Sequence, residues 1–338
     1  MVCTMNADSA TAPRGGIDLG GTKIQTVVVD AGNKVLGEAR RPTPESGGPE
    51  DVAKEMEAAL REAAAQAKVG TEELGSVGVG SPGDANEETG VVSAARNLPG
   101  WEGEFPLGEH LSEALGTRVA IGNDVQVAVE GEFHLGAGRP YDTILGVWWG
   151  TGVGGGLVLD GKPWLGRGAA GEIGHMVIKR GGARCTCGRR GCMEAYAGRA
   201  AMELKARREV KRGAKTDLFK IMKERDRDRL TSGIWERALE HNDKLATHLI
   251  DRAIKALGAG IASAVNLIDP EAVIVGGGLG VRFGDRYVKR IGESMHPHLF
   301  VDDRPPAMHV AELGDLGGAI GAALLSQNSR SPAAAAAG

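Results

Sequence analysis

Residues 16–30 read GIDLGGTKIQTVVVD, and residues 146–160 read GVWWGTGVGGGLVLD. In each stretch a glycine-rich turn leads into a β-rich run that ends on an aspartate, which is the pattern of a β-hairpin. When the two stretches are aligned end to end, Gly16 falls on Gly146 and Gly20 falls on Gly150. This repeat predicts a duplicated architecture, with one glycine-rich hairpin in each half and a cleft between the halves.

Strands and helices alternate along the rest of the chain, which indicates an α/β fold. Apolar residues at helical spacing predict helices over residues 50–67, 107–115, 124–135, 244–267 and 317–326. Short β-rich runs predict strands over residues 24–30, 34–40, 76–80, 118–122 and 272–275, and a second hairpin over residues 143–160. The 53 glycines fall in clusters rather than at a fixed period, which excludes a collagen-like chain.

Length and charge limit the class of protein. A chain of 338 residues is long enough for about two domains. The net charge of −4 gives no basic face for nucleic acid, and the basic run from Lys205 to Lys215 is interpreted as a solvated helix face. No apolar stretch approaches the length of a membrane-spanning helix, and no signal core precedes Arg14. We therefore expect a cytoplasmic protein without a membrane partner.

The two hairpin turns are candidate phosphate-binding elements, because glycines without a Cβ let backbone N–H groups reach phosphate oxygens. Thr22 adds a hydroxyl donor, and Asp18 is suited to hold Mg²⁺ through water. The second turn is followed by a strand and lacks a closing Gly-Lys-Ser/Thr, so it is neither a Rossmann fingerprint nor a Walker A loop. The alternative interpretation is a pair of ordinary tight turns. The candidate phosphate and nucleotide residues are Asp18, Gly20, Gly21, Thr22, Lys23, Thr151, Gly152, Gly276, Gly277 and Gly278.

The stretch from residue 171 to 194 contains GEIGH followed by CTCGRRGCME. Its one histidine and three cysteines, His175, Cys185, Cys187 and Cys192, are the ligand set of a closed zinc site. A redox dithiol is the weaker interpretation, since Cys-Thr-Cys is not a Cys-x-x-Cys motif. Four protein ligands leave no open coordination position, so the sequence predicts a structural zinc ion.

Asn123 and Asp124 stand where a predicted strand ends and a predicted helix begins. Such a pair is a normal helix N-cap, and without other motifs this interpretation is favoured. A carboxylate in this position can also accept a proton from an attacking hydroxyl group. The sequence therefore marks Asp124 as a candidate general base.

Together these motifs resemble the ROK family, and within it the bacterial glucokinases. The motifs that carry the resemblance occur between residues 16 and 325, in the family's order: DLGGTK, SPG, NLPGW, ND, GTGVGGG, GEIGH, CTCGRRGCME and VGGGL. The resemblance implies an actin-like, hexokinase/ribonuclease H-like α/β fold of two domains. It also implies transfer of the ATP γ-phosphoryl group to the 6-hydroxyl of glucose, with ATP, Mg²⁺ and structural Zn²⁺ as cofactors.

The composition of the two ends and the resemblance together divide the chain into domains. We expect a disordered leader over residues 1–14 and a small α/β domain over residues 15–122, which the C-terminal helix at about 313–326 joins. A large domain with the zinc site covers residues 123–312, and residues 327–338 form a disordered tail.

The resemblance also assigns roles to single residues. Asp124 is similar to the family's catalytic base, and His175 is expected to place one ring nitrogen on zinc and the other toward the sugar. The positions that match sugar contacts are Ser81, Gly83, Asn97, Asn123, Asp124, Glu172, His175 and Glu194. Val125 and Gln126 depart from the Ala and Asn that many relatives have after the Asn-Asp pair, which changes the packing beside the base.

The motifs leave the acceptor, the donor and the class of protein open to alternatives. The same motifs occur in kinases for mannose, N-acetylmannosamine, N-acetylglucosamine and fructose, and inorganic polyphosphate is an alternative donor. A sugar-sensing regulator is the other class, but the stretch before Asp18 is too short for a helix-turn-helix module. A homodimer or higher homo-oligomer is the default expectation.

Overall fold

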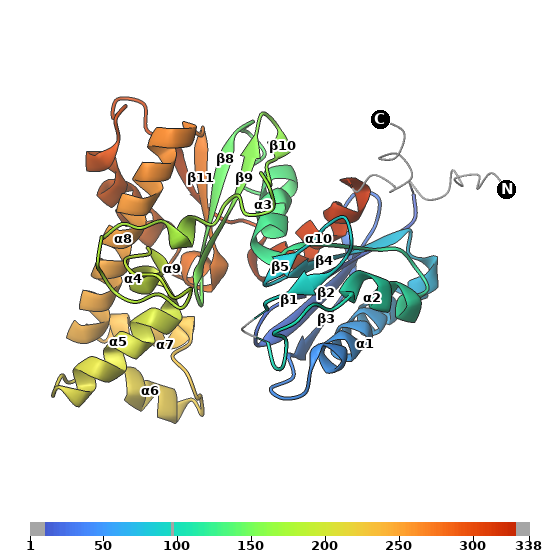
Figure 1. Ribbon diagram of the computed structural model, residues 1–338, viewed down its shortest axis with the longest axis horizontal. Helices are drawn as coiled ribbons and strands as arrows, with labels where there is room; N and C mark the ends of the chain where they lie inside the picture. The colour runs from blue at the N-terminus through green and yellow to red at the C-terminus, as the bar shows by residue number, and fades with distance from the viewer. Residues whose placement is uncertain (1–10, 96–97, 329–338) are drawn as a thin grey trace. The chain divides into compact units, whose positions relative to one another are not determined.

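The computed structural model describes residues 11–95 and 98–328, which form two compact units (Figure 1). Unit 1 contains the described residues up to Leu135 and those from Leu313 onward, and unit 2 contains Gly136–Glu312. The boundary predicted between residues 122 and 123 lies one helix before this division, because the helix Asp124–Leu135 packs on the C-terminal helix. The first strand already begins at Arg14, one residue inside the expected leader.

Unit 1 is built on a five-stranded sheet with the order β3-β2-β1-β4-β7. Its strands are β1 Arg14–Leu19, β2 Lys23–Val29, β3 Val35–Pro42, β4 Ser76–Ser81 and β7 Val119–Asn123, with a separate two-stranded pair, β5 Asp84–Ala85 and β6 Val92–Ser93. Its helices are α1 Pro49–Ala67, α2 Leu107–Leu115, α3 Asp124–Leu135 and α10 Gly317–Asn328, with short 3₁₀ turns η2 Thr71–Glu73 and η5 Gly314–Leu316. The structure thus confirms the helices and strands predicted for this part of the chain, with ends that shift by one or two residues.

The sheet of unit 1 is antiparallel on one side and parallel on the other. Strands β1, β2 and β3 form the antiparallel part, whereas β1, β4 and β7 run parallel. Helices α1 and α2 lie along one face, and α10 lies along the opposite face, where it also contacts α3 (Figure 1).

Helix α10 approaches the backbone of the sheet directly. Gly16 on β1 and Gly78 on β4 are neighbours in register, and both lie under this helix. A Cβ at Gly16 would lie 1.9 Å from the carbonyl oxygen of Ala319, and one at Gly78 would lie 1.7 Å from that of Ala322. Glycine is therefore required at both positions, because any side chain would push the helix off the sheet.

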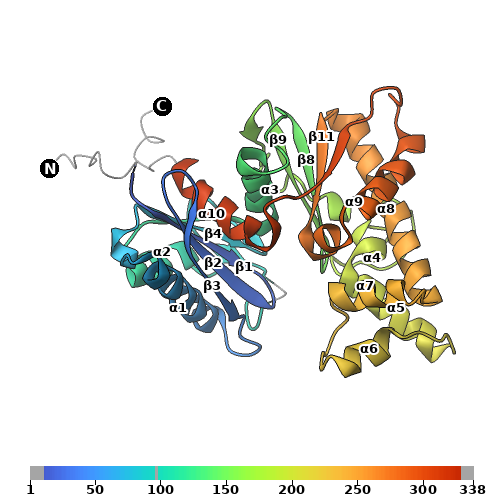
Figure 2. The same ribbon diagram turned by 180° about the vertical axis from the view of Figure 1, so that it is seen from behind.

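Unit 2 repeats this sheet order as β10-β9-β8-β11-β12. Its strands are β8 Ile144–Trp149, β9 Val153–Leu159, β10 Lys162–Pro163, β11 Ala272–Gly276 and β12 Ala307–Val310. Its helices are α4 Glu194–Ala197, α5 Arg199–Lys211, α6 Leu218–Glu224, α7 Ser232–Glu240, α8 Lys244–Ile268 and α9 Gly277–Met295, with 3₁₀ turns η3 Ile173–His175 and η4 His296–His298. Helix α9 packs against β8, β11 and β12, and α8 packs on α9 (Figure 2).

The predicted duplication is confirmed, with one difference. Strands β1 and β2 cover residues 14–19 and 23–29, and β8 and β9 cover residues 144–149 and 153–159. The first and last residues of the second pair therefore lie at one constant distance along the sequence from those of the first pair. The pairing register is shifted, however: Leu19 faces Ile24 in the first hairpin, whereas Trp149 faces Val153 in the second. The second turn is therefore one residue tighter than the first.

Among the residues that the structure describes, no helix combines the length and the apolar character needed to span a membrane.

Replacing Gly78 with alanine is expected to lower the free energy of unfolding by at least about 3 kcal/mol, since the new methyl group meets a main-chain carbonyl that cannot move alone. Gly103→Ala is the matched control, because a Cβ there meets nothing within 4 Å. Chemical denaturation of both variants measures the difference. Equal stabilities would contradict the close approach of α10.

Unfolding should also depend on pH through Glu130 of α3, whose side chain is buried and accepts one hydrogen bond, from Gln126 Nε2 at 3.3 Å. Burial raises the pKa of this carboxyl from 4.5 to about 7, Gln126 opposes the rise, and Glu87 adds to it. The folded state thus holds a proton that the unfolded state releases, so stability falls as pH rises from about 4.5 to 7.

Glu130→Gln removes this titration. The gain in unfolding free energy over the parent protein should be small at pH 4.5 and should grow to about 3 kcal/mol above pH 7, measured by denaturation across that range. Parallel pH profiles for the two proteins would contradict the assignment.

Candidate functional site

The candidate residues of unit 1 gather at one edge of its sheet. Asp18 on β1 is in register with Gly80 on β4, and Ser81 on β4 is in register with Asn123 on β7. These three strands are parallel, so their carboxyl ends meet at the same edge, where ligands bind in open α/β sheets. Asp124 follows as the first residue of α3.

The first glycine turn lies at this edge and is held by hydrogen bonds. Gly20 N–H donates to the carbonyl of Lys23 at 2.9 Å. Thr43, directly after β3, closes the turn, with its hydroxyl donating to Gly20 O at 2.6 Å and its N–H donating to Thr22 O at 3.2 Å. Gly21 and Thr22 remain exposed, so the tip of the turn is open to a ligand.

Asp18 stands beside the N-terminus of α10. A Cβ at Gly318 would lie 2.7 Å from the Asp18 carboxyl, which shows how closely the helix approaches it. Desolvation raises the pKa of Asp18 to about 6, Lys23 opposes the rise, and Asp315 adds to it. The group is therefore mostly ionised at neutral pH and poorly hydrated, which suits an anionic ligand of a cation.

Asn123 and Asp124 form the start of α3. Asn123 Oδ1 accepts hydrogen bonds from Val125 N at 3.1 Å and Gln126 N at 3.2 Å, so the N-cap interpretation of Asn123 is confirmed. Asp124 Oδ1 accepts from Val125 N at 2.9 Å. The Asp124 carboxylate thus lies at the N-terminus of α3, the positive end of the helix dipole.

The other candidates of unit 1 lie on the segment after β4. Ser81 is fully buried, and its hydroxyl donates to the carbonyl of Pro82 at 3.1 Å. Gly83 is exposed in the turn that leads to β5. Asn97 falls outside the described residues.

In unit 2 the second glycine turn is fixed to the start of α5. Arg199 N–H donates to Gly150 O at 3.1 Å, and Ala200 N–H donates to Thr151 O at 3.0 Å. The two donors are helix N–H groups that have no partner within the helix, so the turn caps α5. Thr151 itself is exposed at the tip of the turn.

The glycine cluster after β11 lies beside the same turn. A Cβ at Gly150 would lie 3.8 Å from Gly278 N, and Gly277 begins the helix α9. Two of the predicted phosphate or nucleotide elements therefore meet within unit 2. The N-terminus of a helix is a favourable place for an anion.

The histidine and the three cysteines of the predicted zinc site converge. Their ligand atoms all lie within 4.8 Å of one another. Cys187 Sγ lies 3.7 Å from Cys192 Sγ, and Cys185 Sγ lies 3.7 Å from Nδ1 of His175. A tetrahedral zinc ion with Zn–S bonds of about 2.3 Å holds its sulfurs roughly 3.8 Å apart, whereas a disulfide needs about 2.05 Å. The spacing fits a metal and not a disulfide.

The chemistry of these donors points the same way. Burial raises the pKa of the Cys185 thiol to about 12, and burial followed by the hydrogen bond with Cys187 raises the pKa of Cys192. Three packed thiols cannot all ionise in the absence of a compensating charge, and a bound divalent cation supplies it.

Glu194 and Glu172 differ in their surroundings. Glu194 Oε2 accepts from Val153 N at 3.0 Å, and Glu194 Oε1 accepts from the Thr186 hydroxyl at 3.0 Å. Glu194 thus ties the cysteine loop to the second glycine turn, where a Cβ on Gly152 would lie 2.3 Å from its Oε2. Glu172 is exposed, and its Oε2 lies 3.8 Å from His175 Nε2.

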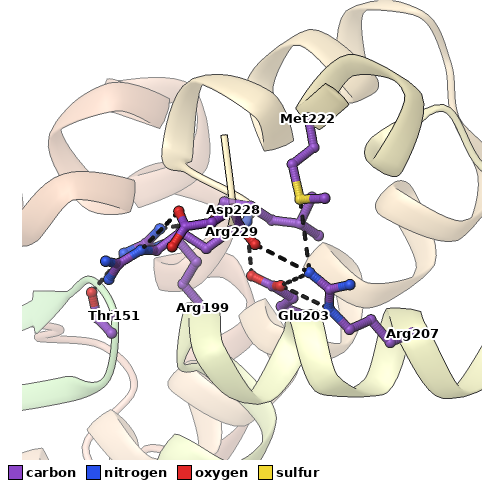
Figure 3. Close-up of polar contacts among 8 residues, drawn as sticks. Thr151, Arg199, Glu203, Arg207, Met222, Asp228 and Arg229 are labelled. Atoms are coloured by element: carbon purple, nitrogen blue, oxygen red, sulfur yellow. Dashed lines mark hydrogen bonds and ion pairs between the residues drawn. The ribbon is translucent and has the colours of Figure 1, made fainter. Parts of the chain in front are cut away.

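The structure adds a group of charged residues that the sequence did not single out. Arg199 and Glu203 on α5 and Arg229 on the loop between α6 and α7 line a cavity together with Thr151 (Figure 3). In the sequence they are ordinary surface charges, and only the spacing of Arg199 and Glu203 by four residues places these two on one helix face.

Comparisons with known proteins agree with this arrangement. The sequence is 34% identical over 268 residues to a glucokinase of Thermotoga maritima, an alignment that covers 78% of this chain and 81% of the relative. It is 34% identical over 321 residues to an N-acetyl-D-glucosamine kinase of Pectobacterium atrosepticum, covering 92% and 97% of the two chains. The crystal structure of a ROK family glucokinase from Streptomyces griseus in complex with glucose and AMPPNP superposes with a TM-score of 0.79 at 30% identity, covering 94% of this chain and 100% of that one.

The structural likeness confirms the actin-like fold that the motifs predict. Residues 14–329 match the sequence model of the ROK family, and this match spans both units. The chain belongs to the ROK family.

Proposed function

We propose that this protein is an ATP-dependent sugar kinase that transfers the γ-phosphoryl group of ATP to the 6-hydroxyl of glucose. The observation that carries the proposal is the single sheet edge of unit 1 that holds both Asp18 and Asp124. Asp18 lies on β1 and Asp124 directly follows β7, and β4 separates these two strands, so the strands are roughly 10 Å apart. Such a separation provides one acid for the metal of the donor and another for the acceptor hydroxyl.

Asp124 is the general base. Phosphoryl transfer depends mainly on positioning and on neutralising charge, with a carboxylate that accepts the proton of the attacking hydroxyl. The hydrogen bond from Val125 N fixes one carboxylate oxygen, so the other oxygen is oriented toward the acceptor hydroxyl.

The glycine turns bind the donor. Thr22 and Thr151 present exposed hydroxyl groups beside backbone N–H groups, and Gly276, Gly277 and Gly278 place a helix N-terminus by the second turn. Asp18 would hold Mg²⁺ through water, and the bound ion would neutralise charge on the donor phosphates.

The His175 and cysteine cluster would hold one structural zinc ion. Because the four ligands close the coordination sphere, the ion takes no part in the transfer. The ion would instead stabilise the cysteine loop, and Glu194 joins this loop to the turn that carries Thr151. Nδ1 of His175 faces the sulfurs, so Nε2 is the nitrogen available to a sugar hydroxyl.

The sugar contacts we propose are Ser81, Gly83, Asn97, Asn123, Glu172, His175 and Glu194. Glu194 keeps spare capacity for such a contact, since each carboxylate oxygen accepts more than one hydrogen bond. The relative named as an N-acetyl-D-glucosamine kinase supports an amino sugar as the second candidate acceptor. A coupled assay of ADP release over hexoses and N-acetylated amino sugars tests the proposal, and glucose should give the highest kcat/KM. Absence of turnover with every sugar would refute it.

Asp124→Asn should lower kcat for glucose phosphorylation by roughly 100- to 10,000-fold, because the amide cannot accept the proton. Glucose binding, measured by calorimetry, should change only a few-fold, since the amide retains hydrogen-bonding capacity. Glu113→Gln on the exposed side of α2 is the control and should keep full activity. A kcat within tenfold of the parent value would remove Asp124 from the role of base.

Metal analysis should find about one zinc ion per chain, and Cys187→Ser should lose it together with thermal stability and sugar affinity. Thr186→Ser is the matched control in the same loop, because it keeps the hydroxyl that donates to Glu194. A metal-free protein with full activity and unchanged melting temperature would overturn the zinc assignment.

A further inference from the structure

A cavity of about 220 Å³ opens in unit 2 beside the second glycine turn. It is lined by Thr151, Arg199, Ala200, Glu203, Leu204, Arg207 and Arg229. Three of these seven residues are arginines. The volume is below the roughly 300–1,000 Å³ of sites for whole drug-sized ligands, so the cavity fits one part of a larger molecule.

The arginines of α5 differ in their partners. Arg199, Glu203 and Arg207 follow one another at intervals of four residues and share one helix face (Figure 3). Glu203 pairs with Arg207, at 2.5 Å and 2.9 Å, which is the favourable order of an acid followed by a base. Glu203 Oε2 also accepts from Leu230 N at 2.7 Å. The Glu203 carboxylate is therefore bound by Arg207 and by Leu230 N.

Arg199 has no such partner. It donates to the Thr151 hydroxyl at 2.7 Å and to the carbonyl of Leu230 at 2.8 Å. Among the residues that the structure describes, no carboxylate forms an ion pair with its guanidinium. Burial, followed by the charge of Arg229, lowers the pKa of Arg199, and Glu203 offsets this only in part. The site therefore concentrates positive charge that an anion would compensate.

Arg229 contributes the second cation. Its ion pair within the described part of the chain is a loose one, Nε to Asp228 Oδ1 at 3.6 Å, and the Asp228 side chain is 79% exposed. Such an exposed contact contributes little, so the guanidinium is able to turn to a stronger anion.

Thr151 connects this charge to the phosphate-binding turn. Because Arg199 donates to Thr151 Oγ1, the hydroxyl hydrogen is left to donate to a ligand. A phosphate group on the turn would thus meet the hydroxyl and the guanidinium side by side. Arginine suits phosphate because its planar fork donates two parallel hydrogen bonds.

We propose that Arg199 and Arg229 form a subsite for a phosphate group of the donor that is not transferred. This inference rests on the proposed function, because it takes the second turn as the donor site. The group is either an inner phosphate of ATP or an inner phosphate of an inorganic polyphosphate chain. The two arginines are then specificity-determining residues of donor binding.

A purely structural role is the competing explanation. Arg207 shows what such a role looks like, since it joins Glu203, the Met222 sulfur and the carbonyl of Asp228 in one network. Arg207→Gln is therefore the matched control for Arg199→Gln: the two arginines share a helix and a cavity, and they differ in having a carboxylate partner.

Steady-state kinetics with ATP and with polyphosphate as separate donors test the subsite. Arg199→Gln should raise the donor KM about tenfold or more, with the KM for sugar unchanged and with Arg207→Gln within about twofold of the parent. Arg199→Lys, which keeps the charge, should recover part of the loss. A rise with ATP alone, with polyphosphate alone or with both supports the subsite and identifies its phosphate source.

Two further measurements keep the outcome decisive. Arg229→Gln alters a side chain that is 41% exposed, so it should fold even if Arg199→Gln does not, and it should raise the same donor KM. Calorimetry with tripolyphosphate measures anion binding without any sugar, so it tests the subsite even in a protein that phosphorylates nothing. Unchanged donor KM and unchanged tripolyphosphate affinity in both variants would overturn the proposal and leave the kinase assignment intact.

Discussion

The contact of α10 with the backbone of β1 and β4 is the constraint on which unit 1 depends. It exists because Gly16 and Gly78 carry no side chain where the helix crosses the sheet. The same helix also packs closely on α3, since a Cβ at Gly321 of α10 would lie 2.1 Å from the carbonyl oxygen of Val127 on α3. Asp18 at one end of this arrangement and Asp124 at the other are thus positioned by a helix that contains neither of them.

The two units share a sheet order but stabilise their glycine turns differently. In unit 1 the segment directly after β3 supplies Thr43, whose hydroxyl and N–H close the first turn. In unit 2 the shorter turn is fixed by the N-terminus of α5 and by the carboxylate of Glu194. Since Glu194 also contacts the cysteine loop, a metal in that loop would stiffen the second turn.

Sequence reasoning succeeded where the determinants are local. The hairpins, the long helix of unit 2, the N-cap at Asn123 and the cysteine cluster all follow from residues close together in the chain. It missed what depends on distant segments. Nothing near Arg199 in the sequence reveals that Glu203 also accepts a hydrogen bond from the loop at Leu230, and nothing near Glu194 reveals its bond to Val153. The strand β12 was missed as well, because four residues paired only with β11 give little periodicity.

The position of α10 in the chain has a consequence for biosynthesis. Unit 2 is inserted between α3 and the last segment of unit 1, so its residues leave the ribosome before α10 does. Until then no helix packs on Gly16 and Gly78 of β1 and β4. Asp18 and Asp124 then lack the helix that positions them. Unit 2 is the part able to fold first during synthesis, and unit 1 is completed only after α10 has left the ribosome. A nascent chain therefore acquires the second turn and its cysteine loop before it acquires a fixed Asp124.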